Sequence, residues 1–254
     1  MKKVVVVLLL FIFPMVVNAK EDKVTINELN TYIRILDMNY YSYEETADIS
    51  VDFGDNPNTN YYIKSIPKSG THVYKEESKS TEFNINLKTL DILNDSYDMD
   101  DGKNSTTIYV GTSSRLLSEK ETIKMEYLIS FTGKKLKKNK EYFFDIAKSD
   151  YDIKKVNFEI ILSDIAKRGT IYFSNNGKDY FEDLDGLTYS KDEYISLKGT
   201  YIKTLKKGES LSIRIVLDEE DRKTKADFKE SVVYCSFGVL GIFISFIIYK
   251  IVKH

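Results

Sequence analysis

The stretch Tyr43–Phe53, YEETADISVDF, alternates residue by residue between two kinds of side chain. A repeat of two is the period of a β-strand, in which successive side chains point to opposite faces. The pattern predicts an antiparallel strand with one buried face and one solvated face. We expect these residues on the buried face: Tyr43, Glu45, Ala47, Ile49, Val51 and Phe53.

The same period recurs along most of the chain before the final apolar run, with turn residues between the repeats. It predicts about ten to twelve short strands and no convincing amphipathic helix. The fold class that fits is all-β, an antiparallel β-sandwich of immunoglobulin-like character, followed by one transmembrane α-helix. Strands are expected at 31–36, 43–53, 61–66, 83–93, 106–110, 121–131, 142–146, 156–162, 171–173, 194–197 and 211–217.

Uncharged residues fill 231–249, SVVYCSFGVLGIFISFIIY. As a helix, this run is about 28 Å long, close to the hydrocarbon thickness of a bilayer. Residues 219–230 are highly charged and fit a juxtamembrane stalk, and 250–254 fit a short cytoplasmic tail that contains Lys250 and Lys253. GxxxG spacing is not met within the span, since Gly238 and Gly241 are three apart.

A second apolar stretch lies near the N-terminus and follows the basic residues Lys2 and Lys3. Small or tolerated residues at 17–19, VNA, then precede a polar run. This order predicts that residues 1–19 are a secretory signal peptide, cleaved after Ala19. An uncleaved N-terminal anchor is the alternative. Together, the two ends predict a single-pass type I membrane protein, with 20–218 as its extracytoplasmic domain. An exported domain of this size without cysteine favours a bacterial cell membrane.

Composition limits the remaining possibilities. The only cysteine, Cys235, lies in the expected span, so the exported domain contains no disulfide and depends on an ordinary apolar core. A net charge of −2 argues against a nucleic-acid partner. The expected partners are therefore the lipid bilayer through 231–249 and an envelope protein or wall component of unknown identity.

Catalytic and metal-binding sets are hard to assemble from this sequence. The only histidines are His72, in a polar stretch, and His254, at the end. With Cys235 in the span, the exported domain lacks the residues for a Cys–His or Ser–His–Asp arrangement or for a His/Cys metal site. We therefore expect no catalytic residues, no cofactor and no metal ligand, and a protein that is not an enzyme.

Four acidic residues close together, Asp95, Asp98, Asp100 and Asp101, form the expected tip of a hairpin around Gly102. Carboxylate oxygens are calcium ligands. In an EF-hand loop, however, Gly102 would be the sixth residue and the twelfth, residue 108, would have to be Glu, whereas it is Ile. A solvated hairpin and a looser calcium site both remain open.

Of three further features, the first excludes a catalytic pair, and the other two each allow a binding or a structural interpretation. Glu44 and Glu45 are adjacent on a strand, so they face opposite ways and cannot form a glycosidase pair. The basic loop 134–140 fits a solvated turn or a contact with anionic lipid or wall polymer. Five tyrosines fit an aromatic binding surface or cross-strand packing, namely Tyr40, Tyr41, Tyr43, Tyr61 and Tyr62.

Several short blocks resemble the N-terminal extracytoplasmic domain of the YciQ-like predicted bacterial membrane proteins, a family of unknown function. The clearest are Tyr43–Phe53, then Ile63–Pro67 at the family's Tyr-Arg-x-Ile-Pro block, Ile108–Gly111, and Leu205–Ile215 before the span. Lys64 replaces the family's arginine. Family members often continue past the first span, so the resemblance implies a short member and assigns no catalytic residue.

The sequence thus favours a binding or interaction module displayed outside the membrane. Two alternatives stay open: a metal-dependent or carbohydrate-acting enzyme, and a structural subunit of a membrane complex that acts through its helix.

Overall fold

Strands make up the regular structure of the described part of the chain. The structure, a computed structural model, describes residues 20–36, 39–74, 79–93, 95–132, 141–162, 169–192 and 196–217. These residues form fifteen strands and no helix. The first eight are β1 (Lys23–Ile35), β2 (Tyr40–Asp52), β3 (Tyr61–Pro67), β4 (Ser69–Tyr74), β5 (Lys79–Leu93), β6 (Tyr97–Asp101), β7 (Ser105–Gly111) and β8 (Lys120–Thr132). The others are β9 (Glu141–Lys148), β10 (Asp152–Ile153), β11 (Val156–Ile161), β12 (Thr170–Ser174), β13 (Leu187–Lys191), β14 (Ser196–Tyr201) and β15 (Ser210–Val216).

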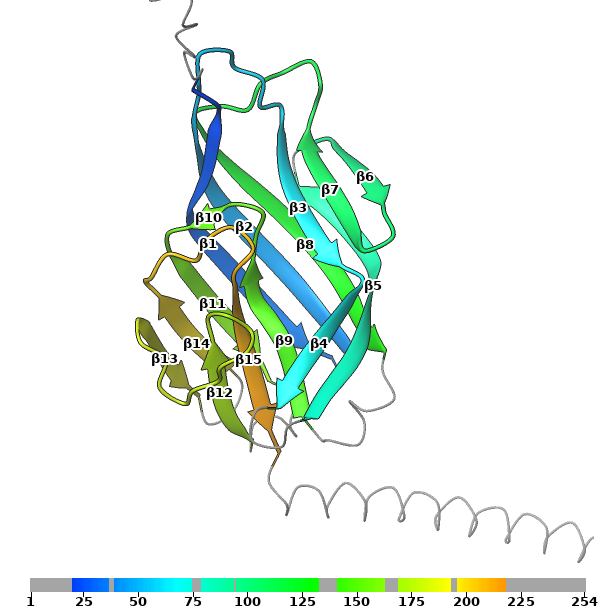
Figure 1. Ribbon diagram of the computed structural model, residues 1–254, viewed down its shortest axis with the longest axis vertical. Coiled ribbons are helices and arrows are strands. Elements are labelled where there is room, and N and C mark those ends of the chain that lie inside the picture. Colours follow the sequence, from blue (N-terminus) through cyan, green and yellow to red (C-terminus); the bar gives the residue numbers. More distant parts are fainter. Residues whose placement is uncertain are drawn as a thin grey trace, which may run out of the picture.

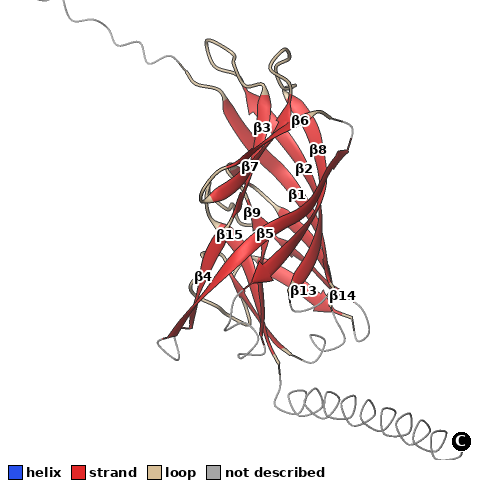
Figure 2. Cartoon of the chain, turned by 90° about the vertical axis from the view of Figure 1, so that its right-hand side faces the viewer, coloured by secondary structure: helices blue, strands red, loops and turns tan. Residues whose placement is uncertain are grey.

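One large sheet and two small sheets contain all of these strands. The nine-stranded sheet has the order β13-β14-β11-β1-β2-β8-β5-β4, and β10 also pairs with β1. The small sheets have the orders β12-β15-β9 and β3-β7-β6. Both small sheets lie on the same side of the large sheet, as the two perpendicular views show (Figures 1 and 2).

Burial follows the alternation that the sequence predicts. In β2, Tyr43, Ala47, Ile49 and Val51 are buried, whereas Glu44 and Asp52 are exposed. The inward side chains of the large sheet pack against those of the small sheets to form one hydrophobic core. The predicted all-β class is therefore confirmed, with strands that are mostly antiparallel.

Two expectations about the strands are wrong. The structure has fifteen strands, more than ten to twelve, because β4, β10 and β13 come from polar stretches without clear alternation and β6 comes from the expected acidic tip. In addition, β1 pairs in parallel with β11, with Leu29 opposite Val156, and in parallel with β10. Only contacts across more than a hundred residues create that pairing, so local periodicity contains no sign of it.

Other expectations fall outside the described residues. These are the signal peptide 1–19, the basic loop 134–140, the stalk 219–230, the span 231–249 and the tail 250–254. Within the described ranges, no helix is long and apolar enough to cross a membrane.

Candidate functional site

Two charged side chains are buried in the core between the sheets. Glu45 lies on the inward face of β2 and is 4 % exposed, and Lys64 lies on the inward face of β3 and is 5 % exposed. Removing either charge from water is costly unless a partner of opposite sign and further hydrogen bonds compensate.

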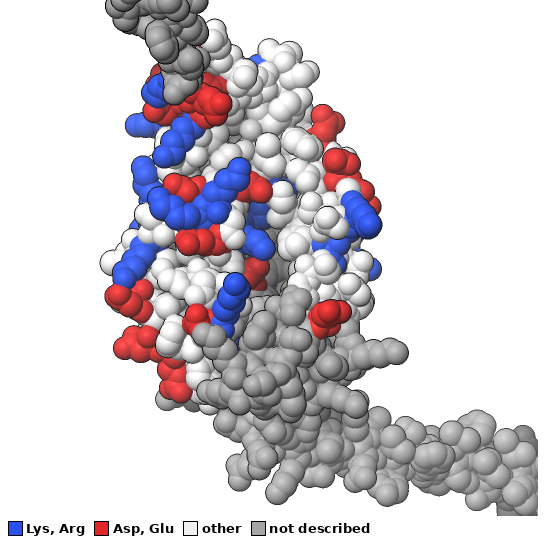
Figure 3. All heavy atoms as spheres, in the orientation of Figure 1, with Lys and Arg blue, Asp and Glu red and all other residues white. Residues whose placement is uncertain are grey.

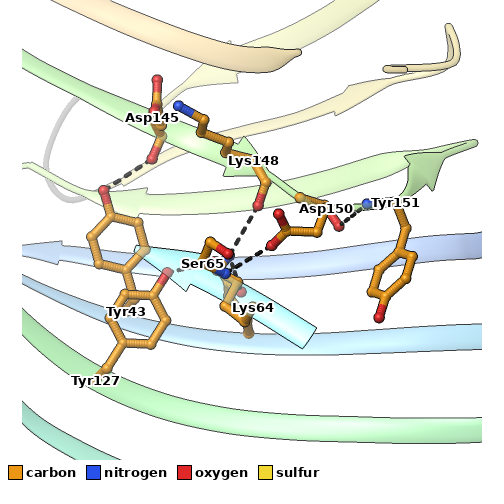
Figure 4. A network of polar contacts seen from close by, with 10 residues as sticks. Tyr43, Lys64, Ser65, Tyr127, Asp145, Lys148, Asp150 and Tyr151 are labelled. Atoms are coloured by element: carbon orange, nitrogen blue, oxygen red, sulfur yellow. Dashed lines mark hydrogen bonds and ion pairs between the residues drawn. The ribbon is translucent and has the colours of Figure 1, made fainter. Parts of the chain in front are cut away.

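Lys64, which belongs to the sheet β3-β7-β6, has partners in both of the other sheets. Its Nζ lies 2.8 and 2.7 Å from the two carboxylate oxygens of Glu45 in the large sheet. The same Nζ donates to the carbonyl of Lys148 on β9 at 3.1 Å. Tyr127 on β8 donates its hydroxyl to Glu45 Oε1 at 2.6 Å. These groups come from β2, β3, β8 and β9, so this single ammonium joins the three sheets. Figure 4 shows Lys64 between Tyr127 and Lys148.

Two stacked tyrosines complete the buried network. The rings of Tyr43 and Tyr127 lie 5.0 Å apart and nearly parallel. Tyr43 donates its hydroxyl to the carbonyl of Asp145 on β9 at 2.9 Å. Burial raises the pKa of both phenols well above the usual value, and nearby carboxylates raise it further. Both hydroxyls therefore stay protonated and act as hydrogen-bond donors.

Side chains also close the facing edges of β3 and β9, which are the end strands of their sheets. On β3, the N–H of Ile63 donates to Tyr151 Oη at 2.9 Å and the N–H of Ser65 donates to Asp150 Oδ2 at 2.8 Å. Pro67, the next residue on that edge, has no N–H. On β9, the carbonyls of Asp145 and Lys148 accept hydrogen bonds from the side chains of Tyr43 and Lys64. We call this junction of the two small sheets the seam.

The interior of the seam is too small for a substrate. A cavity of about 70 Å³ lies there, with mostly apolar walls and the Glu45–Lys64 pair at its side. Benzene-sized ligands need roughly twice this volume. The three donors of the Lys64 ammonium also match its three acceptor atoms in the seam. The network therefore holds the sheets together.

The seam opens to the surface in a larger depression of about 490 Å³, which we call the seam hollow. Residues from β1, β3, β10 and three connecting segments surround it. Its lining residues are Asp22, Lys23, Val24, Asn58, Thr59, Asn60, Tyr61, Ile63, Asp150, Tyr151, Asp152 and Lys207.

Backbone N–H groups fix the carboxylates of the seam hollow. Asp22 accepts from the N–H groups of Gly54, Asn58 and Thr59 at 2.7–2.9 Å, and these bonds lower its pKa to about 2. The N–H of Lys207 lies 3.0 Å from Asp152 Oδ1 and is the main cause of the lowered pKa of Asp152. Both groups are therefore ionised acceptors at neutral pH.

Two aromatic rings and one side-chain amide in the hollow are also held in place. Tyr61 meets Tyr109 edge to face at 6.0 Å, and Tyr151 packs against Tyr62 at 5.4 Å. Burial raises the pKa of Tyr151 to about 12, so its hydroxyl keeps a proton while its oxygen accepts from Ile63. Asn60 donates its side-chain amide to the carbonyl of Ser113 at 2.9 Å. The polar groups and the rings of the hollow are thus fixed in position.

The structure separates the acidic residues that the sequence places in one tip. Asp98, Asp100 and Asp101 lie on the exposed strand β6 and not in a turn. Asp101 contacts Lys68 Nζ at 2.7 Å and Asp95 lies 3.9 Å from Arg115. Among the described residues, no three His, Cys, Asp or Glu side chains gather as metal ligands.

The other candidates take different places. Glu44 is exposed and Glu45 is buried, as expected for opposite faces of one strand. Of the five tyrosines, Tyr41, Tyr43 and Tyr62 are buried in the core, so they do not form a continuous binding surface. His72 lies in β4, while Cys235 and His254 lie outside the described residues.

Sequence reasoning missed the Glu45–Lys64 pair, although a signal was present. Each charged residue occupies a position of its strand that alternation assigns to the core. A charge in an apolar register requires a buried partner. The pair also links the blocks 43–53 and 63–67, which carry the family resemblance. Asp22, Asp150 and Tyr151 gave no comparable signal, because they lie outside the regular alternation.

Comparisons with known proteins give little further information. No family model and no curated protein matches the chain. Among solved structures, it is similar to a candidate protease from Parabacteroides distasonis, with 8 % identity, 76 % of this chain and 40 % of that chain covered, and a TM-score of 0.35. It is also similar to an M1 zinc metallopeptidase from Deinococcus radiodurans, with 4 % identity, 76 % and 42 % covered, and a TM-score of 0.34. The chain spans about two fifths of the length of these proteins, and the likeness is too distant to assign an activity.

Proposed function

We propose that this protein is a bacterial single-pass membrane protein whose β-domain binds a component of the cell envelope at the seam hollow. The domain is an extracytoplasmic β-sandwich of immunoglobulin-like character, built from residues 20–218. The proposed span 231–249 anchors it, with the signal peptide 1–19 directing export. The resemblance to the YciQ-like family remains part of this proposal and adds no activity.

One observation carries the binding role: the polar groups of the seam hollow are fixed before any ligand arrives. Backbone N–H groups hold Asp22, Asp150 and Asp152, and neighbouring rings hold Tyr61 and Tyr151. A site that is already ordered loses little conformational entropy on binding. A concave surface with a few oriented polar groups is the usual form of a ligand site.

The electrostatics of the hollow favour binding over hydrolysis. A carbohydrate-acting enzyme of the common kind needs one carboxyl group with a raised pKa, which donates a proton to the leaving group. In the hollow, hydrogen bonds lower the pKa of both Asp22 and Asp152. These carboxylates can accept hydrogen bonds but are poor proton donors at neutral pH.

Site-specific crosslinking in intact cells tests this role. A photoreactive phenylalanine analogue replaces Tyr61 in the hollow, and a matched protein carries it at Tyr189, which is exposed on β13. We expect Tyr61 to yield a discrete crosslinked product with an envelope protein or wall material. Equal yields from the two positions would contradict the proposal.

A further inference from the structure

We propose that the ligand of the seam hollow is a neutral oligosaccharide. This inference rests on the proposed binding function and names the class of ligand. Its basis is the combination of fixed acceptors, amide and ammonium donors and two tyrosine rings in one depression.

The size and form of the hollow suit a short segment of a glycan. Its volume of about 490 Å³ lies within the range of roughly 300–1,000 Å³ that is common for small-ligand sites. It is open to solvent and extends from the loop residues 58–60 to the turn at Lys207. An open depression of this kind admits a section of a longer chain, with both ends of the glycan outside.

The hydrogen-bonding groups match hydroxyls. Each sugar hydroxyl has one donor and two acceptor lone pairs, so it needs both kinds of partner. Asp22, Asp150 and Asp152 supply acceptors, while Lys23 and Lys207 supply donors. Because backbone N–H groups already orient the three carboxylates, a ligand hydroxyl meets an acceptor in a fixed position.

The tyrosine rings supply the apolar part of the site. Sugar rings have faces made of C–H groups, and aromatic side chains bury such surface while their polar tip stays hydrated. Tyr61 is half-buried on β3, and Tyr151 lies across the seam from it. The phenol of Tyr151 also keeps its proton, which provides a hydroxyl donor beside the ring.

Charge argues against an anionic ligand. The lining contains three carboxylates and two lysines, so its formal charge is negative. The ammonium of the neighbouring Lys206 already lies 3.3 Å from Asp152 Oδ2, which reduces the attraction that a bound anion would feel. More widely, Lys and Arg side chains are interspersed with Asp and Glu side chains over the described part of this face (Figure 3).

Titration calorimetry on the full-length protein in detergent micelles tests the inference. The probes are β-1,4-linked tetrasaccharides of glucose and of N-acetylglucosamine and an α-1,4-linked tetrasaccharide of glucose, with oligogalacturonate as an anionic control. We expect at least one neutral probe to bind with a Kd on the order of 1 mM or tighter. Tyr61→Ala should weaken it at least about tenfold, whereas Tyr189→Ala should not.

Hydrogen exchange read by mass spectrometry gives a measurement that does not depend on the variants. With the neutral probe bound, we expect slower exchange at residues 58–63 and 150–152. Failure of every neutral probe to bind, protection elsewhere, or equal binding of oligogalacturonate would overturn the inference. If the sugars fail but Tyr61 still crosslinks to an envelope protein, the ligand is a protein and the proposed binding function stands.

Discussion

At the scale of single residues, the Glu45–Lys64 pair makes the most direct prediction. Lys64→Met leaves the Glu45 carboxylate buried among apolar groups and removes the donor to Lys148. Breaking a buried pair by removing one partner costs roughly 3–5 kcal/mol. We expect a loss of that size in the free energy of unfolding, measured by urea denaturation of the solubilised chain with tyrosine fluorescence.

A double variant separates the loss of the pair from the loss of packing. Glu45→Met combined with Lys64→Met removes both charges and keeps similar side-chain volume. Replacing a whole buried pair by apolar residues is often nearly neutral. The double variant should therefore be more stable than Lys64→Met alone. Equal instability of the two variants would show that the charges themselves do not matter.

Asp22 predicts a pH dependence. Its pKa is lowered to about 2 by the N–H groups of Asn58 and Gly54, against 3.8 for the unperturbed group. A lowered pKa means that the native state favours the ionised form, so the stabilisation is complete above about pH 4 and is lost as pH falls towards 2. In the Asp22→Asn variant, the melting temperature should therefore fall less steeply as the pH is lowered from about 4 towards 2. Asp98→Asn, at an exposed position of β6, should leave this pH dependence unchanged.

At the same scale, the sequence predicts orientation better than partnership. Alternation within Tyr43–Phe53 places Glu45 on the inward face, which the structure confirms. The identity of its partner depends on how β3 crosses over β2, and that arrangement arises from core packing between sheets. For this reason, the buried charge was predictable and the pairing with Lys64 was not.

At the scale of elements, the closed edge of β3 can be tested by hydrogen exchange. Tyr151→Phe removes the acceptor of the Ile63 N–H and leaves the acceptor of the Ser65 N–H, Asp150, in place. A typical hydrogen bond contributes about 1 kcal/mol, so exchange at Ile63 should accelerate about fivefold. NMR exchange rates measure this, and Ser65 is the internal control. Unchanged exchange at Ile63 would mean that the phenol does not protect this edge.

The end of β7 depends on a glycine. Gly111 has a φ of 129°, a conformation that residues with a side chain rarely adopt, and an added Cβ would lie 2.3 Å from the carbonyl oxygen of Asn60. Gly111→Ala should therefore lower the free energy of unfolding by more than about 1 kcal/mol. Gly208 also has a positive φ, 83°, but no atom lies within 4 Å of a Cβ added there. Gly208→Ala should therefore lower the free energy of unfolding by less than Gly111→Ala in the same urea denaturation.

At this scale, the sequence predicts where many strands end, but it does not predict which distant strands pair. Pro67 ends β3, and Gly102 follows β6, where turn residues were expected. In contrast, β6 has all five side chains exposed, so its acidic sequence indicated a turn and not a strand. The parallel pairing of β1 with β11 brings together segments that no local pattern relates.

At the scale of the whole molecule, three sheets share one core in a described domain without cysteine. Cross-links cannot hold the small sheets together, and buried side chains do so at the seam. The seam hollow is the outer end of that junction. Its ordered residues, Asp150 and Tyr151, are also the residues that close β3, so the same contacts stabilise the fold and shape the proposed site.

The proposed orientation in the membrane gives the last prediction. If 231–249 stops transfer and residues 1–19 direct export, the β-domain faces outward and His254 faces the cytoplasm. Because Cys235 is the only cysteine, Cys235→Ser gives a background without thiols. In that background, Met99→Cys should react with a membrane-impermeant maleimide in intact cells, since Met99 is 54 % exposed on β6. His254→Cys should react only after permeabilisation. Labelling of His254→Cys in intact cells, with Met99→Cys protected, would reverse the orientation and place the seam hollow out of reach of any wall glycan.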